Sequence, residues 1–428
     1  MARTVHELTP PAERAILIGA PRKGAGAKHI VQEHLEELAR LADTAGAHVV
    51  GTLTQQLDRP HAGTYLGKGK IEELTTLASD KAASLIIFDD ELSPAQGKAI
   101  EDAVGKRVMD RAELILDIFA VRARSAEAKM QVELAQLEYM LPRLTRMWTH
   151  LEKFRGGIGV RGPGETQLET DRRLIGHRLR VLKERLVDVT RSRAIQRAGR
   201  KDAFRTALVG YTNAGKSSVL RGLSGQADIF VEDRLFATLD PLTREVKVGD
   251  SAHVLVTDTV GFIRKLPHHL VASFRATLEE VTEASVLLHV IDASDPTWEE
   301  HREVVDEVLA DLGVHDAEMV HVFNKMDLLP ADQAEAFEAR MAELIPGSVF
   351  VSSVKPGGLE ALRGRLLALQ QASRPVQEFR VPAADGRTLA ELHRSGEVVE
   401  QITEGEVIVV RARVSQEAAG RIRARLGA

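Results

Sequence analysis

The stretch that decides the fold is Gly210-Tyr211-Thr212-Asn213-Ala214-Gly215-Lys216-Ser217, which matches the phosphate-loop pattern GxxxxGK[ST]. An apolar run at residues 206–209 precedes it and a helical pattern at 218–223 follows, which is the strand–loop–helix context that the motif requires. In such loops, backbone N–H groups surround a β-phosphate at the N-terminus of a helix. We therefore expect Lys216 to bridge the β- and γ-phosphates and the Ser217 hydroxyl to ligate Mg²⁺.

Two further elements typical of a nucleotide switch follow in the required order. Asp258-Thr259-Val260-Gly261 ends an apolar strand, so that Asp258 can hold a Mg²⁺-bound water and the Gly261 amide can reach the γ-phosphate. Between the two motifs, Phe236-Ala237-Thr238-Leu239-Asp240 offers Thr238 to complete the Mg²⁺ shell when a γ-phosphate is present. The expected catalytic residues are Lys216, Thr238 and Gly261, and the expected metal ligands are Ser217 and Thr238.

A fourth motif, Asn324-Lys325-Met326-Asp327, indicates which base is bound. Asp327 can accept hydrogen bonds from both N1–H and the exocyclic amine of guanine, whereas adenine offers no such pair of donors. A buried carboxylate left unpaired by the wrong base can discriminate by ~10⁴. Ser352-Ser353-Val354, after another strand, is expected to support guanine O6 through a backbone amide. The four ordered motifs predict a protein that binds and hydrolyses GTP.

The residue after the DxxG motif is Phe262, where many such hydrolases carry a glutamine that orients the attacking water. A hydrophobic side chain cannot polarise water, which predicts slow intrinsic hydrolysis and activation by a partner. Arg234, Arg244 and Arg264 flank the switches as candidates for charge stabilisation, with an ordinary surface position as the alternative.

The chain length of 428 residues exceeds what one hydrophobic core usually organises, which predicts a multidomain protein. Alternating β-type and helical runs at 15–109 favour a small parallel α/β domain over residues 1–120. Two apolar stripes at helical spacing predict an antiparallel helical hairpin over 121–203, with a glycine-rich tip at 156–164. A P-loop G domain is expected over 204–371 and a small α+β domain over 372–428.

The predicted hairpin is strongly basic within an acidic protein. Residues 143–205 contain 17 Lys/Arg against 7 Asp/Glu, although the whole chain has a formal net charge of −5. A solvated helical surface is one explanation, but the one-signed excess favours a nucleic-acid partner. The glycine-rich tip is either a flexible turn or a finger that approaches a partner closely, with Arg155 and Arg161 available for phosphates.

The amino-acid composition indicates the cellular compartment. The chain has no cysteine, which excludes disulfides and thiol nucleophiles and favours a reducing compartment, so we expect a cytoplasmic protein. The apolar runs are too short for an export signal or for membrane insertion.

The block Arg155–Glu169, RGGIGVRGPGETQLE, together with GYTNAGKS, FATLDPLTR and DTVGFIRKLP, resembles the HflX GTPase family. The resemblance implies binding to the large ribosomal subunit and ribosomal RNA, ribosome-stimulated GTP hydrolysis with Mg²⁺, and dissociation or rescue of stalled ribosomes under stress. It also favours insertion of the glycine-rich tip into RNA. Independently of the resemblance, we expect the protein to be a monomer. The alternative is a GTP-gated RNA-binding assembly or dormancy factor that does not split ribosomes.

Overall fold

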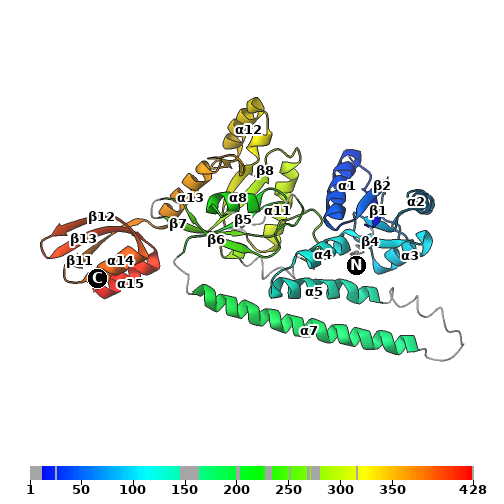
Figure 1. Ribbon diagram of the computed structural model, residues 1–428, viewed down its shortest axis with the longest axis horizontal. Helices are drawn as coiled ribbons and strands as arrows, with labels where there is room; N and C mark the ends of the chain where they lie inside the picture. The colour runs from blue at the N-terminus through cyan, green and yellow to red at the C-terminus, as the bar shows by residue number, and fades with distance from the viewer. Residues whose placement is uncertain are drawn as a thin grey trace, which may run out of the picture. The chain divides into compact units, whose positions relative to one another are not determined.

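The computed structural model describes residues 12–24, 27–144, 163–198, 203–226, 234–249, 252–267, 270, 280–314 and 317–426 (Figure 1). The chain forms two compact units. Unit 1 comprises residues 1–188 together with 234–236 and 265–274, and unit 2 comprises 189–233, 237–264 and 275–428. The predicted multidomain α/β fold is confirmed.

Unit 1 contains a four-stranded parallel sheet in the order β2-β1-β3-β4 with helices on both faces. Its elements are β1 (Arg14–Gly19), α1 (Ala27–Thr44), β2 (His48–Thr54), α2 (Lys68–Asp80), β3 (Leu85–Phe88), α3 (Pro94–Val104), β4 (Arg107–Asp110) and α4 (Arg111–Arg122). Helix α2 packs with α3 and helix α1 packs with α4, one pair on each face (Figure 1). Every residue of β3 is buried, as expected for a parallel strand that is covered on both sides.

Helix α4 is absent from the sequence-based prediction because it follows β4 without a loop. Asp110 is both the last residue of β4 and the N-cap of α4, where its carboxylate accepts a hydrogen bond from the Glu113 amide at 3.0 Å. Arg111, only 2% exposed, is paired with the buried carboxylates of Glu37 and Asp89. These buried charges fix α1 and α4 against the carboxyl end of β3.

The helical region consists of α5 (Ala126–Met140), the short η1 (Leu141–Arg143) and α7 (Pro163–Ala198). Figure 1 shows α5 and α7 along one another, and two ion pairs join them: Arg178–Glu133 at 2.6 Å and Lys183–Glu138 at 2.7 Å. The stripe predicted for α7 is buried or half-buried at each of its described positions: Ile175, Leu179, Leu182, Leu186 and Val189.

The first predicted helix is interrupted at Pro142. Helix α5 ends at Met140 and gives way to a 3-10 turn that contains Pro142, which cannot donate the next helical hydrogen bond. The described positions of its predicted apolar stripe are all buried or half-buried: Met130, Leu134, Leu137, Leu141 and Leu144. The buried face of α5 also includes Ala128, Gln131, Val132, Ala135 and Tyr139.

Part of the hairpin lies outside the described residues. Arg155 and Arg161 belong to that part, as do Trp148, Leu151 and most of the glycine-rich tip. The last two residues of the tip, Pro163 and Gly164, are instead the start of α7. Proline at the first helical position is favourable because its missing N–H would have no helical partner there.

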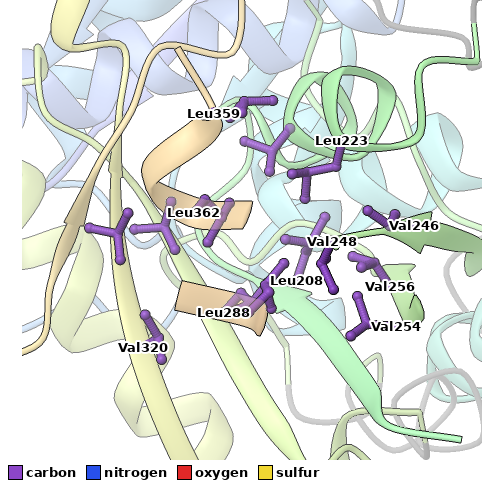
Figure 2. Packing of buried hydrophobic residues seen from close by; sticks show 14 of the residues in the cluster. Leu208, Leu223, Val246, Val248, Val254, Val256, Leu288, Val320, Leu359 and Leu362 are labelled. Atoms are coloured by element: carbon purple, nitrogen blue, oxygen red, sulfur yellow. The ribbon is translucent and has the colours of Figure 1, made fainter. Parts of the chain in front are cut away.

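Unit 2 is built on a six-stranded sheet in the order β10-β9-β8-β5-β7-β6, parallel except for the edge strand β6. Its elements are β5 (Arg205–Val209), α8 (Lys216–Ser224), β6 (Leu242–Lys247), β7 (His253–Asp258), β8 (Val286–Asp292), α11 (Trp298–Asp311), β9 (Glu318–Asn324), η2 (Met326–Leu328), α12 (Ala331–Leu344), β10 (Val349–Phe350) and α13 (Glu360–Ser373). Leucines and valines of α8 and α13 cover one face of the sheet, where they pack on Leu208, Leu288 and Val256 (Figure 2). Strand β6 is not predicted from the sequence because its side chains are mostly exposed or half-buried.

The C-terminal part of unit 2 is a three-stranded antiparallel sheet in the order β11-β13-β12. Its elements are β11 (Val376–Pro382), α14 (Gly386–Ser395), β12 (Gly396–Glu404), β13 (Val407–Val414) and α15 (Gln416–Leu426). Apolar side chains of α14 and α15 pack on one face of this sheet around Phe379 and Val410. Within the described ranges of both units, none of the helices has the length and apolarity needed to cross a membrane.

Candidate nucleotide-binding site

The predicted nucleotide motifs meet at the carboxyl ends of the strands in the sheet of unit 2. The phosphate loop follows β5, the DxxG motif begins at the end of β7, and Asn324 is the last residue of β9. Strand β5 lies between β7 and β8, so the chain turns to opposite sides of β5 at this point. In open α/β sheets, ligands bind in the crevice where the strand order reverses in this way.

The phosphate loop is wound tightly around Lys216. Gly215 has a φ of +94°, and a Cβ atom there would lie 2.3 Å from Nδ2 of Asn324, so only glycine fits. Lys216 is 6% exposed, and its ammonium donates to the carbonyl oxygens of Gly210 at 3.1 Å and Tyr211 at 2.9 Å. Burial lowers the pKa of Lys216 to about 8, although the nearby Asp258 opposes this shift. A polyanionic ligand would stabilise the charged form of this lysine.

Three oxygen-bearing side chains converge beside Lys216. The Ser217 hydroxyl donates to Oδ2 of Asp258 at 2.6 Å and lies 2.8 Å from the hydroxyl oxygen of Thr238. Asp258 is fully buried, which raises the pKa of its carboxyl group against the opposing effect of Lys216. Its second oxygen, Oδ1, is buried and has no hydrogen-bond partner among the described residues. A buried set of oxygen donors with an unsatisfied carboxylate oxygen fits Mg²⁺.

The side-chain amide of Asn324 joins its own loop, at the end of β9, to the phosphate loop and to the loop that contains Ser353. It is fully buried, donates from Nδ2 to the Ala214 carbonyl at 3.0 Å, and accepts at Oδ1 from the Ser353 amide at 3.1 Å. The sequence motif identifies Asn324 as part of the base site, but it does not reveal this cross-link, because both partners are distant in sequence.

The two charged residues that follow have different surroundings. Lys325 adopts a φ of +64°, and its ammonium pairs with Asp292, at the end of β8, at 2.6 Å. Met326 donates its amide to Val351 at 3.2 Å, which fixes the turn at η2. Oδ1 of Asp327 is buried, and no described residue hydrogen-bonds to it. This carboxylate oxygen is therefore available to a ligand that carries N–H donors.

The residues Ser352, Ser353 and Val354 form a loop after β10, called the serine loop. Its first residue is buried and its last is exposed. Ser352 is 6% exposed and its hydroxyl accepts from the Lys355 amide at 3.1 Å. Ser353 is half-buried, and its amide is engaged by Asn324 rather than being directed to a base. Val354 is 68% exposed.

The switch residues fall into two groups. Ala237, Thr238 and Asp240 are half-buried and Leu239 is buried in unit 2, whereas Phe236 belongs to unit 1, where its ring packs edge-on against Phe119 at 4.7 Å. The four residues of the DxxG motif, 258–261, are closely packed. Thr259 donates to the Leu208 carbonyl at 2.6 Å, Val260 is 6% exposed, and a Cβ atom on Gly261 would lie 2.7 Å from Cα of Thr212.

The side chain of Phe262 is fully buried, and its backbone forms a bridge with the phosphate loop. Thr212 donates its amide to the Phe262 carbonyl at 2.7 Å, and Phe262 donates its own amide to Gly210 at 3.1 Å. Among the flanking arginines, Arg234 is exposed and Arg244 half-buried, whereas Arg264 is 9% exposed and contacts Glu300 at 3.3 Å. The surface alternative is therefore wrong for Arg264.

Three family models match successive parts of the chain. They are described as GTP-binding GTPase N-terminal over residues 32–120, GTP-binding GTPase Middle Region over 122–200, and 50S ribosome-binding GTPase over 205–325. Together they cover the N-terminal sheet, the helical region and the nucleotide motifs as far as Lys325.

Relatives that carry the description GTPase HflX match most of the chain. The protein of Caldanaerobacter subterraneus subsp. tengcongensis is 43% identical over 98% of this chain and 95% of its own length. The Escherichia coli K12 protein is 43% identical over 83% of each chain. Among solved structures, a GTP-binding protein from Sulfolobus solfataricus in complex with GDP is 23% identical, with a TM-score of 0.44, over 83% of this chain and 98% of that chain.

The unsatisfied carboxylate of Asp327 leads to a test of base recognition. In an Asp327→Asn variant, the amide can accept only one of the two guanine donors, so affinity for GTP should fall by about 10²-fold or more while affinity for xanthosine triphosphate rises. Titration with fluorescent nucleotides measures both. The exposed Asp332→Asn change on α12 is the matched control. Unchanged GTP affinity in Asp327→Asn would contradict the assignment of guanine to this carboxylate.

Proposed function

The chain belongs to the HflX family of GTPases, and from this premise we propose that it binds the large ribosomal subunit and uses its GTP cycle to dissociate stalled ribosomes under stress. It is a GTP hydrolase, as its family and its G domain indicate. The ribosomal partner is supported by the match of residues 205–325 to a 50S ribosome-binding GTPase family. The large subunit is proposed as the partner because that family is described as binding the 50S ribosome.

The exposed arginines of α7 carry the proposal of an RNA partner. Arg172, Arg173, Arg180 and Arg185 are all exposed, whereas Arg178 and Lys183 are engaged by carboxylates of α5. Four exposed guanidinium groups lie within fourteen residues of one helix, a stretch in which Glu184 is the one exposed carboxylate. Arginine recognises phosphate with two parallel hydrogen bonds, and a local excess of positive charge attracts nucleic-acid backbones.

At the nucleotide site we propose that Lys216 binds the β- and γ-phosphates and that Gly261 contacts the γ-phosphate through its amide. Ser217 and Thr238 would hold Mg²⁺, with Asp258 supporting a metal-bound water. When bound, the metal ion neutralises charge on the phosphate oxygens. Asp327 would read guanine, and Asn324 holds the three loops at a fixed spacing. The buried side chain of Phe262 leaves no water-orienting group at its position, which is consistent with slow unaided hydrolysis.

The exposed arginines of α7 should determine how binding to large subunits depends on salt. Replacing Arg172, Arg173, Arg180 and Arg185 together by glutamine removes up to four charges that can pair with phosphates. The slope of log affinity against log salt should then fall by about one for each phosphate that is no longer neutralised. Filter binding of labelled protein to purified large subunits over a salt series measures the slope.

The matched control is Arg387→Gln combined with Arg394→Gln, two exposed arginines of the C-terminal sheet domain. An unchanged slope in the α7 variant would contradict RNA binding by these four arginines.

Sedimentation of intact ribosomes distinguishes dissociation from simple occupancy. With GTP or a non-hydrolysable analogue, the protein should convert intact ribosomes into free subunits, and Asp327→Asn with the same nucleotides should not. If neither nucleotide releases subunits although the protein sediments with the large subunit, the splitting role is wrong. The GTP-gated assembly or dormancy factor would then be the better description.

A further inference from the structure

Tyr211, in the variable part of the phosphate loop, connects that loop to two other segments of unit 2. Its side chain is 7% exposed and its ring stacks on the imidazole of His301 in α11, with centroids 3.8 Å apart and planes 11° from parallel. Its hydroxyl oxygen accepts a hydrogen bond at 2.9 Å from the backbone amide of Arg264, three residues after Gly261. The phosphate-loop pattern accepts any residue at position 211, so phosphate binding itself does not require this tyrosine.

The stacking partner of Tyr211 is itself restrained. Nε2 of His301 lies 3.4 Å from the hydroxyl of Thr297, and its Nδ1 lies 3.7 Å from Asp295. Glu300, the preceding residue of α11, contacts the guanidinium of Arg264 at 3.3 Å. Helix α11 therefore holds Arg264 in two ways. His301 positions the Tyr211 ring, whose hydroxyl binds the Arg264 backbone amide, and Glu300 contacts the Arg264 guanidinium.

Arg264 is close enough in sequence to Gly261 to fix the position of the DxxG segment. The Phe262 carbonyl already accepts from the Thr212 amide, so residues 262 and 264 are both fastened to the phosphate loop. In this arrangement a Cβ atom on Gly261 would lie 3.1 Å from the ammonium nitrogen of Lys216. The backbone of Gly261 therefore lies beside the lysine that is expected to bind the γ-phosphate.

We propose that Tyr211 is a positioning residue that holds the DxxG segment beside Lys216 and thereby increases the preference for GTP over GDP. The group that distinguishes the two nucleotides is the γ-phosphate, and Gly261 and Lys216 are the groups assigned to it. Freeing Arg264 from Tyr211 increases the range of positions open to Gly261, which lowers affinity for GTP. Binding of GDP is spared, since GDP makes no contact with Gly261. This effect on nucleotide discrimination rests on the proposed GTP site and is independent of the ribosomal role.

The test compares GDP with a non-hydrolysable GTP analogue on the full-length protein in Mg²⁺ buffer. Tyr211→Phe keeps the ring and its stacking but removes the hydroxyl. The ratio of analogue affinity to GDP affinity should fall by about two- to tenfold, the effect of one hydrogen bond. Tyr139→Phe is the matched control, since it removes a buried hydroxyl from α5, and its ratio should equal that of the unmodified protein.

A ratio that is unchanged or higher in Tyr211→Phe overturns the proposal. If Tyr211→Phe also weakens GDP binding, Glu300→Gln decides, because it loosens Arg264 without altering the phosphate loop. A lower ratio in Glu300→Gln supports the proposal, and an unchanged ratio overturns it.

Discussion

The nucleotide site depends on the buried side-chain amide of Asn324, which ties the phosphate loop to the serine loop from the end of β9. Its two hydrogen bonds have no competition from water, so breaking either would leave a buried polar group unpaired, at a cost of roughly 1–3 kcal/mol. The parallel sheet brings β5 and β9 to one edge, and this amide fastens the phosphate loop and the serine loop to the end of β9. The position of Gly215, packed against Asn324, follows from the same contact.

Electrostatics around this scaffold favour a polyphosphate and a metal ion. Lys216 and Asp258 are both buried, and burial disfavours the charged form of each. It lowers the pKa of Lys216 and raises the pKa of Asp258, while the attraction between the two charges opposes both shifts. An anionic phosphate beside Lys216 and a cation beside Asp258 would each relieve that desolvation. The segment after the DxxG motif contacts the phosphate loop through the backbone of Phe262 and through the hydroxyl of Tyr211. The phosphate loop and the segment after DxxG are therefore in direct contact within unit 2.

Local sequence patterns predicted the nucleotide motifs and most of the strands, because each depends on residues that are adjacent in sequence. Strand β6 was not predicted because its sequence has no apolar pattern; the strand forms by pairing with β7. For α5 the apolar periodicity located the stripe but not the buried polar residues beside it, such as Gln131, because periodicity counts only apolar side chains. The burial of Arg264 and the links made by Asn324 and Tyr211 depend on long-range contacts that motif spacing does not encode. The roles assigned to the individual nucleotide contacts remain predictions.

We propose that this chain binds GTP on its own but needs the ribosome to hydrolyse it efficiently, since the side chain of Phe262 is buried and cannot orient water. Steady-state GTP hydrolysis with and without purified large subunits measures that dependence. We expect slow turnover alone and an increase of at least about tenfold with saturating subunits, within the range of up to ~10⁵-fold that partners give other GTPases. A hydrolysis rate that is indifferent to large subunits would contradict both the dependence on a partner and the identity of that partner.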